Sequence, residues 1–187
     1  MLLLLFLAAG LLAGFVRGGR LGNLGQMPLR HGWLAVLALV GQGVAFSPVG
    51  GLFPVLTAPL YLTSNLLLFL PVAFNIHLAG MRLFGLGLLC NALVISLNGG
   101  YMPVSPAAQR LAGLEQRAEI LEAQGRHYNT VLMTADTRLT FLGDIIPWPL
   151  LPIPFRNVYS LGDFLIGGGG FWLVVRGMGR ERASPDS

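Results

Sequence analysis

Long stretches without charged residues alternate with short charged stretches along this chain. Between Arg30 and Arg82 lie 51 residues without a single Asp, Glu, Lys or Arg. One helix of that length would measure about 76 Å, more than twice the ~30 Å of a bilayer's hydrocarbon core. The stretch must therefore turn back on itself. The sequence Ser-Pro-Val-Gly-Gly at 47–51 predicts the turn, because proline lacks a backbone donor and glycine accepts a positive φ.

The same pattern predicts an all-α fold, a polytopic bundle of about five transmembrane helices that forms one membrane domain over residues 1–187. The helices are expected near residues 2–16, 32–46, 52–74, 83–97 and 158–175. Pro54, Pro59 and Pro71 fall within the third of these helices and predict a kink there. Gly10 and Gly14 in the first helix form a pair of small residues four positions apart, and a run of four glycines at 167–170 lies in the fifth. Both predict close contact between helices, with local unwinding of the fifth helix as the alternative.

The segment 98–157 has a different character and is predicted to lie outside the membrane. Ser105 and Pro106 resemble an N-cap followed by proline at the first helical position, and Gly125 can end the helix. Apolar residues recur between them at helical spacing, which predicts a short amphipathic helix: Leu111, Leu114, Ala118 and Leu121. The proline-rich stretch 147–155 cannot continue a regular helix and is predicted to be extended.

The composition supports a membrane protein, since 54% of the residues are hydrophobic and only 11% are charged, against about a quarter in a typical soluble domain. All twelve basic residues are arginine. They are divided among separate loops, which argues against nucleic acid as a partner. The single Cys90 excludes a disulfide within the chain.

The arginines also predict an orientation. Arg17, Arg20 and Arg30 fall on the side that carries the greater positive charge, together with the C-terminal tail 176–187, and that side is expected to be cytoplasmic. The N-terminus would then lie outside a bacterial cytoplasmic (inner) membrane. These three arginines are predicted to bind the anionic headgroups of membrane lipids.

Three groups of residues carry a resemblance to a known family. They are Asn98-Gly99-Gly100-Tyr101-Met102-Pro103, Gly143-Asp144-Ile145-Ile146-Pro147 and Ser160-Leu161-Gly162-Asp163. The chain resembles a family of small bacterial membrane proteins that is known only as a domain of unknown function. That resemblance implies a membrane topology and no particular activity.

Two carboxylates in these motifs carry the candidate site. Asp144 and Asp163 both fall near predicted helix ends at the outer face, and capping of the fifth helix by Asp163 is one interpretation. The other interpretation is a small polar pocket, because ionisable groups at a membrane are costly and tend to serve a function. The pocket would join both carboxylates to Arg138, Asn98 and Asn91.

No cofactor or metal site is predicted. His31, His77 and His127 lie far apart and lack the spacing of metal ligands, and no Gly-x-Ser-x-Gly motif is present. The sequence therefore argues against an enzyme, although two carboxylates within about 5 Å could still hold a divalent ion against a phosphate.

Three functions stay open at this level. The first is a structural or accessory subunit of a membrane complex, with protein partners. The second is a small transporter or a protein that binds lipid or solute in a polar pocket at the outer face. The third is a membrane enzyme acting on a lipid-linked or phosphorylated substrate.

Overall fold

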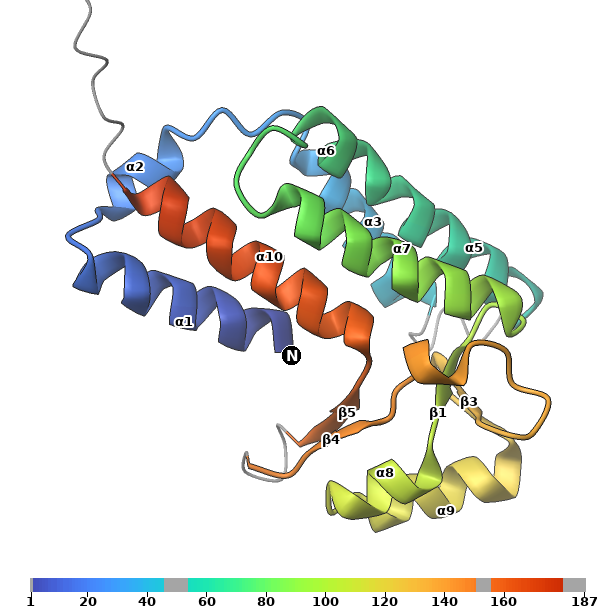
Figure 1. Cartoon of the computed structure of the whole chain (residues 1–187). Coiled ribbons are helices and arrows are strands. Elements are labelled where there is room, and N and C mark those ends of the chain that lie inside the picture. The colour runs from blue at the N-terminus through green and yellow to red at the C-terminus, as the bar shows by residue number, and fades with distance from the viewer. Residues whose placement is uncertain (1, 46–53, 151–155, 180–187) are drawn as a thin grey trace, which may run out of the picture.

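The computed structural model describes residues 2–45, 54–150 and 156–179. Most of the helices form the upper part of the structure, and short strands with two further helices, α8 and α9, form its lower part (Figure 1). The helices are α1 (Leu2–Val16), α2 (Leu21–Gly25), α3 (Trp33–Ala45), α5 (Pro54–Leu67), α6 (Phe69–Phe74), α7 (Met81–Leu97), α8 (Pro106–Leu111), α9 (Glu115–Gln124) and α10 (Leu161–Met178). The predicted turn at 47–51 lies outside the described residues.

The transmembrane prediction is wrong. Among the described residues, no helix combines the length and the apolar character that crossing a membrane requires. The predicted third span divides into α5 and α6 at Leu68, and α10 contains Asp163 and Arg176 as well as its glycines. This finding overturns the polytopic bundle, and with it the inner-membrane location and the orientation that were inferred from the bundle.

Helix α10 packs against both α1 and α7 through glycines, as the glycine runs predicted. A Cβ on Gly10 would lie 3.1 Å from the carbonyl oxygen of Phe171, and a Cβ on Gly167 would lie 2.5 Å from the ring of Phe6. On the other side of α10, a Cβ on Gly87 of α7 would lie 2.5 Å from the carbonyl oxygen of Gly162. The absence of side chains at these positions lets the three helices approach closely.

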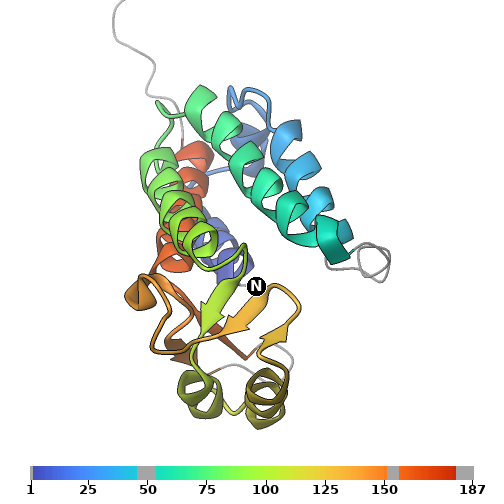
Figure 2. The ribbon, with the colours of Figure 1, turned by 90° about the vertical axis from the view of Figure 1, so that its right-hand side faces the viewer.

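Helices α3, α5 and α6 form a second arm beside the α1, α7 and α10 arm (Figure 2). A cluster of buried side chains joins the arms where α6 meets the start of α7: Val72, Met81 and Leu88, with Phe84 and Ile166 packed against them. Farther along, the arms are separated by a cavity that is described below.

The lower part contains strands that the all-α prediction missed. β1 (Met102–Val104) pairs in parallel with β3 (Thr130–Leu132), which pairs antiparallel with β2 (Arg126–His127). A second ribbon pairs β4 (Ile146–Trp148) antiparallel with β5 (Asn157–Tyr159), and η1 (Thr140–Leu142) is a single 3₁₀ turn. Strands of two or three residues carry too little alternation to be seen in a sequence, and their pairing is not local.

The predicted helix at 106–124 is divided into α8 and α9 by Gly113, which has a φ of +73°. Its predicted ends are confirmed, because Ser105 Oγ accepts a hydrogen bond from the Ala108 amide and Gly125 adopts a φ of +71°. Ala118 and Leu121 are buried as predicted, whereas Leu111 is 70% exposed. Because the helix is broken after Leu111, the buried cluster at α8 contains Ala108 and Ala112 and not Leu111.

Candidate functional site

A cavity of about 600 Å³ lies between the two helical arms, above the small sheets. Its walls are largely apolar and come from both arms, including Leu29, Leu68, Val72, Phe84, Leu88 and Ile166. Asn65 of α5 is a polar lining residue on one arm. The other polar lining residues come from the second half of α7, the start of α10, and the strands and loops below: Asn91, Asn129, Asp144, Asn157, Tyr159 and Asp163. We call this second group the polar floor.

The start of α10 holds one half of the polar floor in place. Ser160 Oγ accepts a hydrogen bond from the Asp163 amide, and Asp163 Oδ2 accepts one from the Ser160 amide, at 3.1 Å each. This capping box confirms the capping interpretation of Asp163. The other carboxylate oxygen, Oδ1, accepts a hydrogen bond of 3.1 Å from Asn91 Nδ2, so two of the residues that were predicted to line a polar pocket are in contact.

Asp144 supplies the other half of the polar floor, and its backbone is fixed to β1. Its amide donates to the Pro103 carbonyl at 2.8 Å, and its own carbonyl accepts from the Ser105 amide at 3.0 Å. The residue is half-buried, but its Oδ1 atom is shielded from solvent and has no hydrogen-bond partner among the described residues. Loss of solvation, followed by repulsion from Asp163, raises the pKa of this carboxyl group well above its ordinary value.

Tyr159 lies in the same acidic surroundings. Its hydroxyl is buried without a hydrogen-bond partner in the described chain. Burial raises the pKa of Tyr159, and the carboxylates of Asp163 and Asp144 raise it further. No Arg or His of the described residues lines this cavity, so the negative charge of its floor is not neutralised there.

Stability should depend on the ionisation of Asp144. The pKa of Asp144 is raised in the folded chain above its ordinary value of 3.8, so the folded chain binds this proton more tightly than the unfolded chain does. The stabilisation is therefore complete below pH 3.8 and is lost as the pH rises through the folded-state pKa. We expect Asp144→Asn to remove this loss, so that denaturant unfolding shows the variant gaining stability over the parent chain as pH increases.

The exposed Asp136 provides a control for that measurement. Asp136→Asn should leave the pH dependence of the free energy of unfolding unchanged. Parallel curves for Asp144→Asn and the parent chain would show that Asp144 ionises as it does in the unfolded chain.

Asn98 and Arg138, which were predicted to line the pocket with Asp144 and Asp163, are used differently. Asn98 Nδ2 donates to the carbonyls of Val94 and Arg138, and Asn98 Oδ1 accepts from the Arg138 amide at 3.0 Å. Asn98 thus holds the backbone of Arg138 at the end of α7. The exposed Arg138 side chain makes no ion pair with Asp144 or Asp163 among the described residues. Neither Asn98 nor Arg138 lines the cavity.

Tyr159 and Ser160 belong to the site, although sequence reasoning did not select them. Ser160 precedes Asp163 by three residues, which is the spacing of a capping box and could have identified it. Nothing in the sequence around Tyr159 indicates that its hydroxyl is buried beside two carboxylates. That arrangement depends on the pairing of β4 with β5.

The three arginines that were predicted to bind lipid lie in different settings. Arg17 lines a separate cavity at the end of α1, Arg20 is exposed, and the backbone of Arg30 is bound by the side chain of Asn75. No observation tests their binding of lipid headgroups, which stays a prediction.

The fold and the polar floor define a helical protein with an acidic cavity between two arms. Residues 26–175, which are 150 of the 187, match a family described as a family of unknown function (DUF5317), and the chain belongs to that family. This match confirms the resemblance to a family of unknown function. Neither a curated protein nor a solved structure matches the chain.

Proposed function

We propose that this chain is a binding protein for an amphipathic amine, a molecule with an apolar body and a protonated amino group. The observation that carries the proposal is the unpartnered carboxyl oxygen of Asp144 at the polar end of an apolar cavity. A buried carboxylate needs a cation or a hydrogen-bond donor, and in the described chain no such partner is present at Oδ1.

The charge of the polar floor favours an amine over other head groups. Asp163 raises the pKa of Asp144, and both carboxyl groups raise the pKa of Tyr159. A second anion placed there would add to this repulsion, whereas a protonated amine would reduce it. The amine can also donate to the Asp144 carboxylate and to the Tyr159 hydroxyl oxygen, both of which lack hydrogen-bond partners in the described residues.

The walls of the cavity suit an apolar body. Side chains from both arms, such as Leu29, Val72 and Ile166, line the part above the polar floor. The volume of about 600 Å³ falls within the range of roughly 300–1,000 Å³ that is typical of small-molecule sites. Burial of an alkyl chain would contribute about 0.8 kcal/mol per methylene group.

Three probes with the same alkyl chain test the head group: decylamine, decanol and decanoate, each below its micelle concentration. We expect calorimetry to find decylamine bound most tightly and decanoate most weakly. In Asp144→Asn the preference for the amine over the alcohol should fall by about tenfold or more, because a charged hydrogen bond is worth about 1.5–3 kcal/mol. Binding of decanol should change little.

The pH dependence provides a second readout. The amine should bind more tightly as the pH rises through the pKa of Asp144, because the ionised carboxylate is its partner. Asp136→Asn is the control and should bind all three probes as the parent chain does. Equal affinity for amine and alcohol in the parent chain would refute the proposal.

The other two predicted functions have less support. For an accessory subunit, a protein partner that copurifies with the chain is the required observation. For an enzyme that uses a metal, the described residues contain no group of three or more His, Cys, Asp or Glu side chains placed to hold an ion. Both hypotheses stay predictions.

A further inference from the structure

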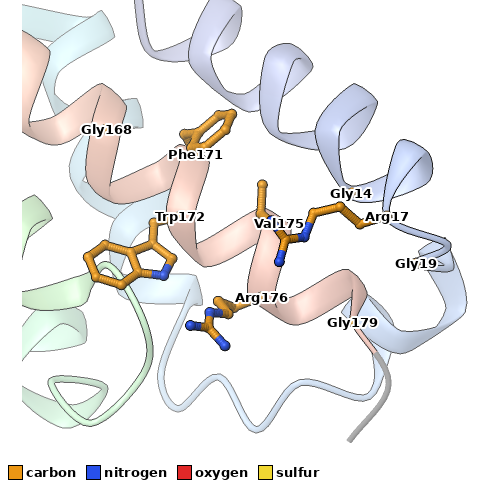
Figure 3. Close-up of a pocket in the computed structure, with 9 residues that line it drawn as sticks. All are labelled: Gly14, Arg17, Gly19, Gly168, Phe171, Trp172, Val175, Arg176 and Gly179. Carbon is orange, nitrogen blue, oxygen red and sulfur yellow. The ribbon is translucent and has the colours of Figure 1, made fainter.

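A second cavity lies at the opposite end of α10 from the polar floor. It has a volume of about 700 Å³ and is lined by the ends of α1 and α10 (Figure 3). Arg17 extends from the end of α1 toward α10, and Arg176 and Trp172 project from α10 itself (Figure 3). Two guanidinium groups from residues 159 positions apart in the sequence therefore line the same cavity.

Close packing of two parallel helices brings these arginines together. α1 and α10 run in the same direction, so that Gly10 contacts Phe171 and Gly14, one turn later, contacts Met178. Side chains at the two glycines would separate the helices. Their absence places the last turn of α1 directly beside the last turn of α10.

The turn after α1 is tied to the end of α10 as well. The Arg20 amide donates to the Met178 carbonyl at 3.0 Å, and Asn23 Nδ2 donates to the same carbonyl at 2.9 Å. A Cβ on Gly19 would lie 2.7 Å from that carbonyl oxygen, so the turn lies as close as its backbone allows. The positions of both arginine backbones are therefore set by the fold.

The two positive charges are not neutralised within the described part of the chain. Neither guanidinium group has a hydrogen bond or an ion pair there. Capping of the helix ends does not require them, because the carbonyls of Gly14, Arg176 and Met178 already accept backbone or Asn23 amides. Two positive charges that line one cavity repel each other, and an anion bound between them would reduce this repulsion.

We propose that this cavity binds a phosphate group through Arg17 and Arg176. Guanidinium groups present paired donors that match the oxygens of a phosphate, and they stay charged at every physiological pH. The apolar side chains beside them, Phe171, Trp172 and Val175, suit a phosphate that is attached to an organic group. The site is independent of the amine cavity, and its failure would leave the proposed function unaffected.

Two probes distinguish the sources of such a phosphate. Titration with inorganic phosphate, followed by calorimetry at constant ionic strength, measures a free anion. Sedimentation with vesicles of phosphatidylcholine, prepared with and without phosphatidylglycerol, measures a lipid headgroup. For whichever probe binds, Arg17→Gln and Arg176→Gln should each weaken binding about tenfold, because each removes a charge-assisted hydrogen bond.

Arg20→Gln is the matched control, since Arg20 lies in the same turn and carries the same charge but does not line the cavity. It should change binding by less than about twofold, because Arg20 does not line the cavity and salt weakens the effect of exposed charges outside it. The thermal midpoints of all three variants should stay close to that of the parent chain, because these side chains are exposed. Absence of binding to both probes, or an equal loss in Arg20→Gln, would overturn the site.

Discussion

Gly169→Ala is expected to destabilise the fold by about 3 kcal/mol, because the added methyl group meets backbone atoms rather than flexible side chains. A Cβ at Gly169 would lie 2.5 Å from the Phe84 amide nitrogen and 2.7 Å from the Gly80 carbonyl oxygen. Neither atom can move without shifting the start of α7 away from α10. Chemical denaturation should show a lower midpoint with the same dependence on denaturant concentration.

The adjacent Gly168 provides the control within the same run of four glycines. A Cβ at Gly168 would meet only Leu83 Cδ2, at 3.4 Å, which is an ordinary contact. Gly168→Ala should therefore stabilise the chain by up to about 1 kcal/mol, since alanine favours a helix more than glycine does. If both substitutions changed stability in the same direction by similar amounts, α7 and α10 would not pack as described.

Asn75→Ala is expected to cost about 3 kcal/mol, because Asn75 is completely buried and makes three hydrogen bonds. Its Nδ2 donates to the carbonyls of Arg30 and Pro71, at 2.7 and 2.6 Å, and its Oδ1 accepts from the Arg30 amide at 2.8 Å. Alanine would leave the amide and carbonyl groups of Arg30 without these partners. Thermal or denaturant unfolding measures the loss.

Asn98 makes the same three kinds of hydrogen bond and provides the matched comparison. It binds the backbone of Arg138 and the carbonyl four residues earlier, that of Val94, but it lies at a partly exposed position. Water can replace the lost bonds there, so Asn98→Ala should cost only about 1 kcal/mol. Equal losses at the two positions would mean that burial does not determine the cost of removing this arrangement.

The two proposed sites lie at the two ends of α10, and their charges are opposite. Asp163 is in the first turn of the helix and Arg176 is in its last turn. An acidic residue at the N-terminus and a basic residue at the C-terminus both favour the helix dipole. The helix therefore stabilises the negative charge of Asp163 and the positive charge of Arg176, which lie about 20 Å apart along the axis at 1.5 Å per residue.

Several features of this fold follow from local sequence. The bounds of α1 are those predicted from its uncharged run, residues 2–16. The caps at Ser105 and Asp163 and the helix end at Gly125 were also predicted correctly. Each depends on the conformation or side-chain chemistry of a few neighbouring residues, and such information is present in a short stretch of sequence.

The membrane prediction failed because the spans were measured between charged residues. Several helices end at uncharged residues, as at Leu67 and Phe74. Asn75 and Asn98, which are also uncharged, come directly after helices, and their side chains bind the backbone of other segments. A run without charges is therefore longer than the helix within it. The short strands were missed for a related reason, since β1 and β3 are stabilised by pairing across 28 residues and not by their own pattern.

For the proposed sites, the sequence by itself identified the candidate groups: two aspartates, an asparagine that accompanies them, and arginines without lysine. Only the tertiary structure decided how they combine. It placed Asp144, Asp163 and Tyr159 on one cavity floor, used Asn98 to hold the backbone of Arg138, and brought Arg17 beside Arg176. Contacts between residues far apart in sequence depend on how helices and strands pack, and that packing is a property of the whole chain.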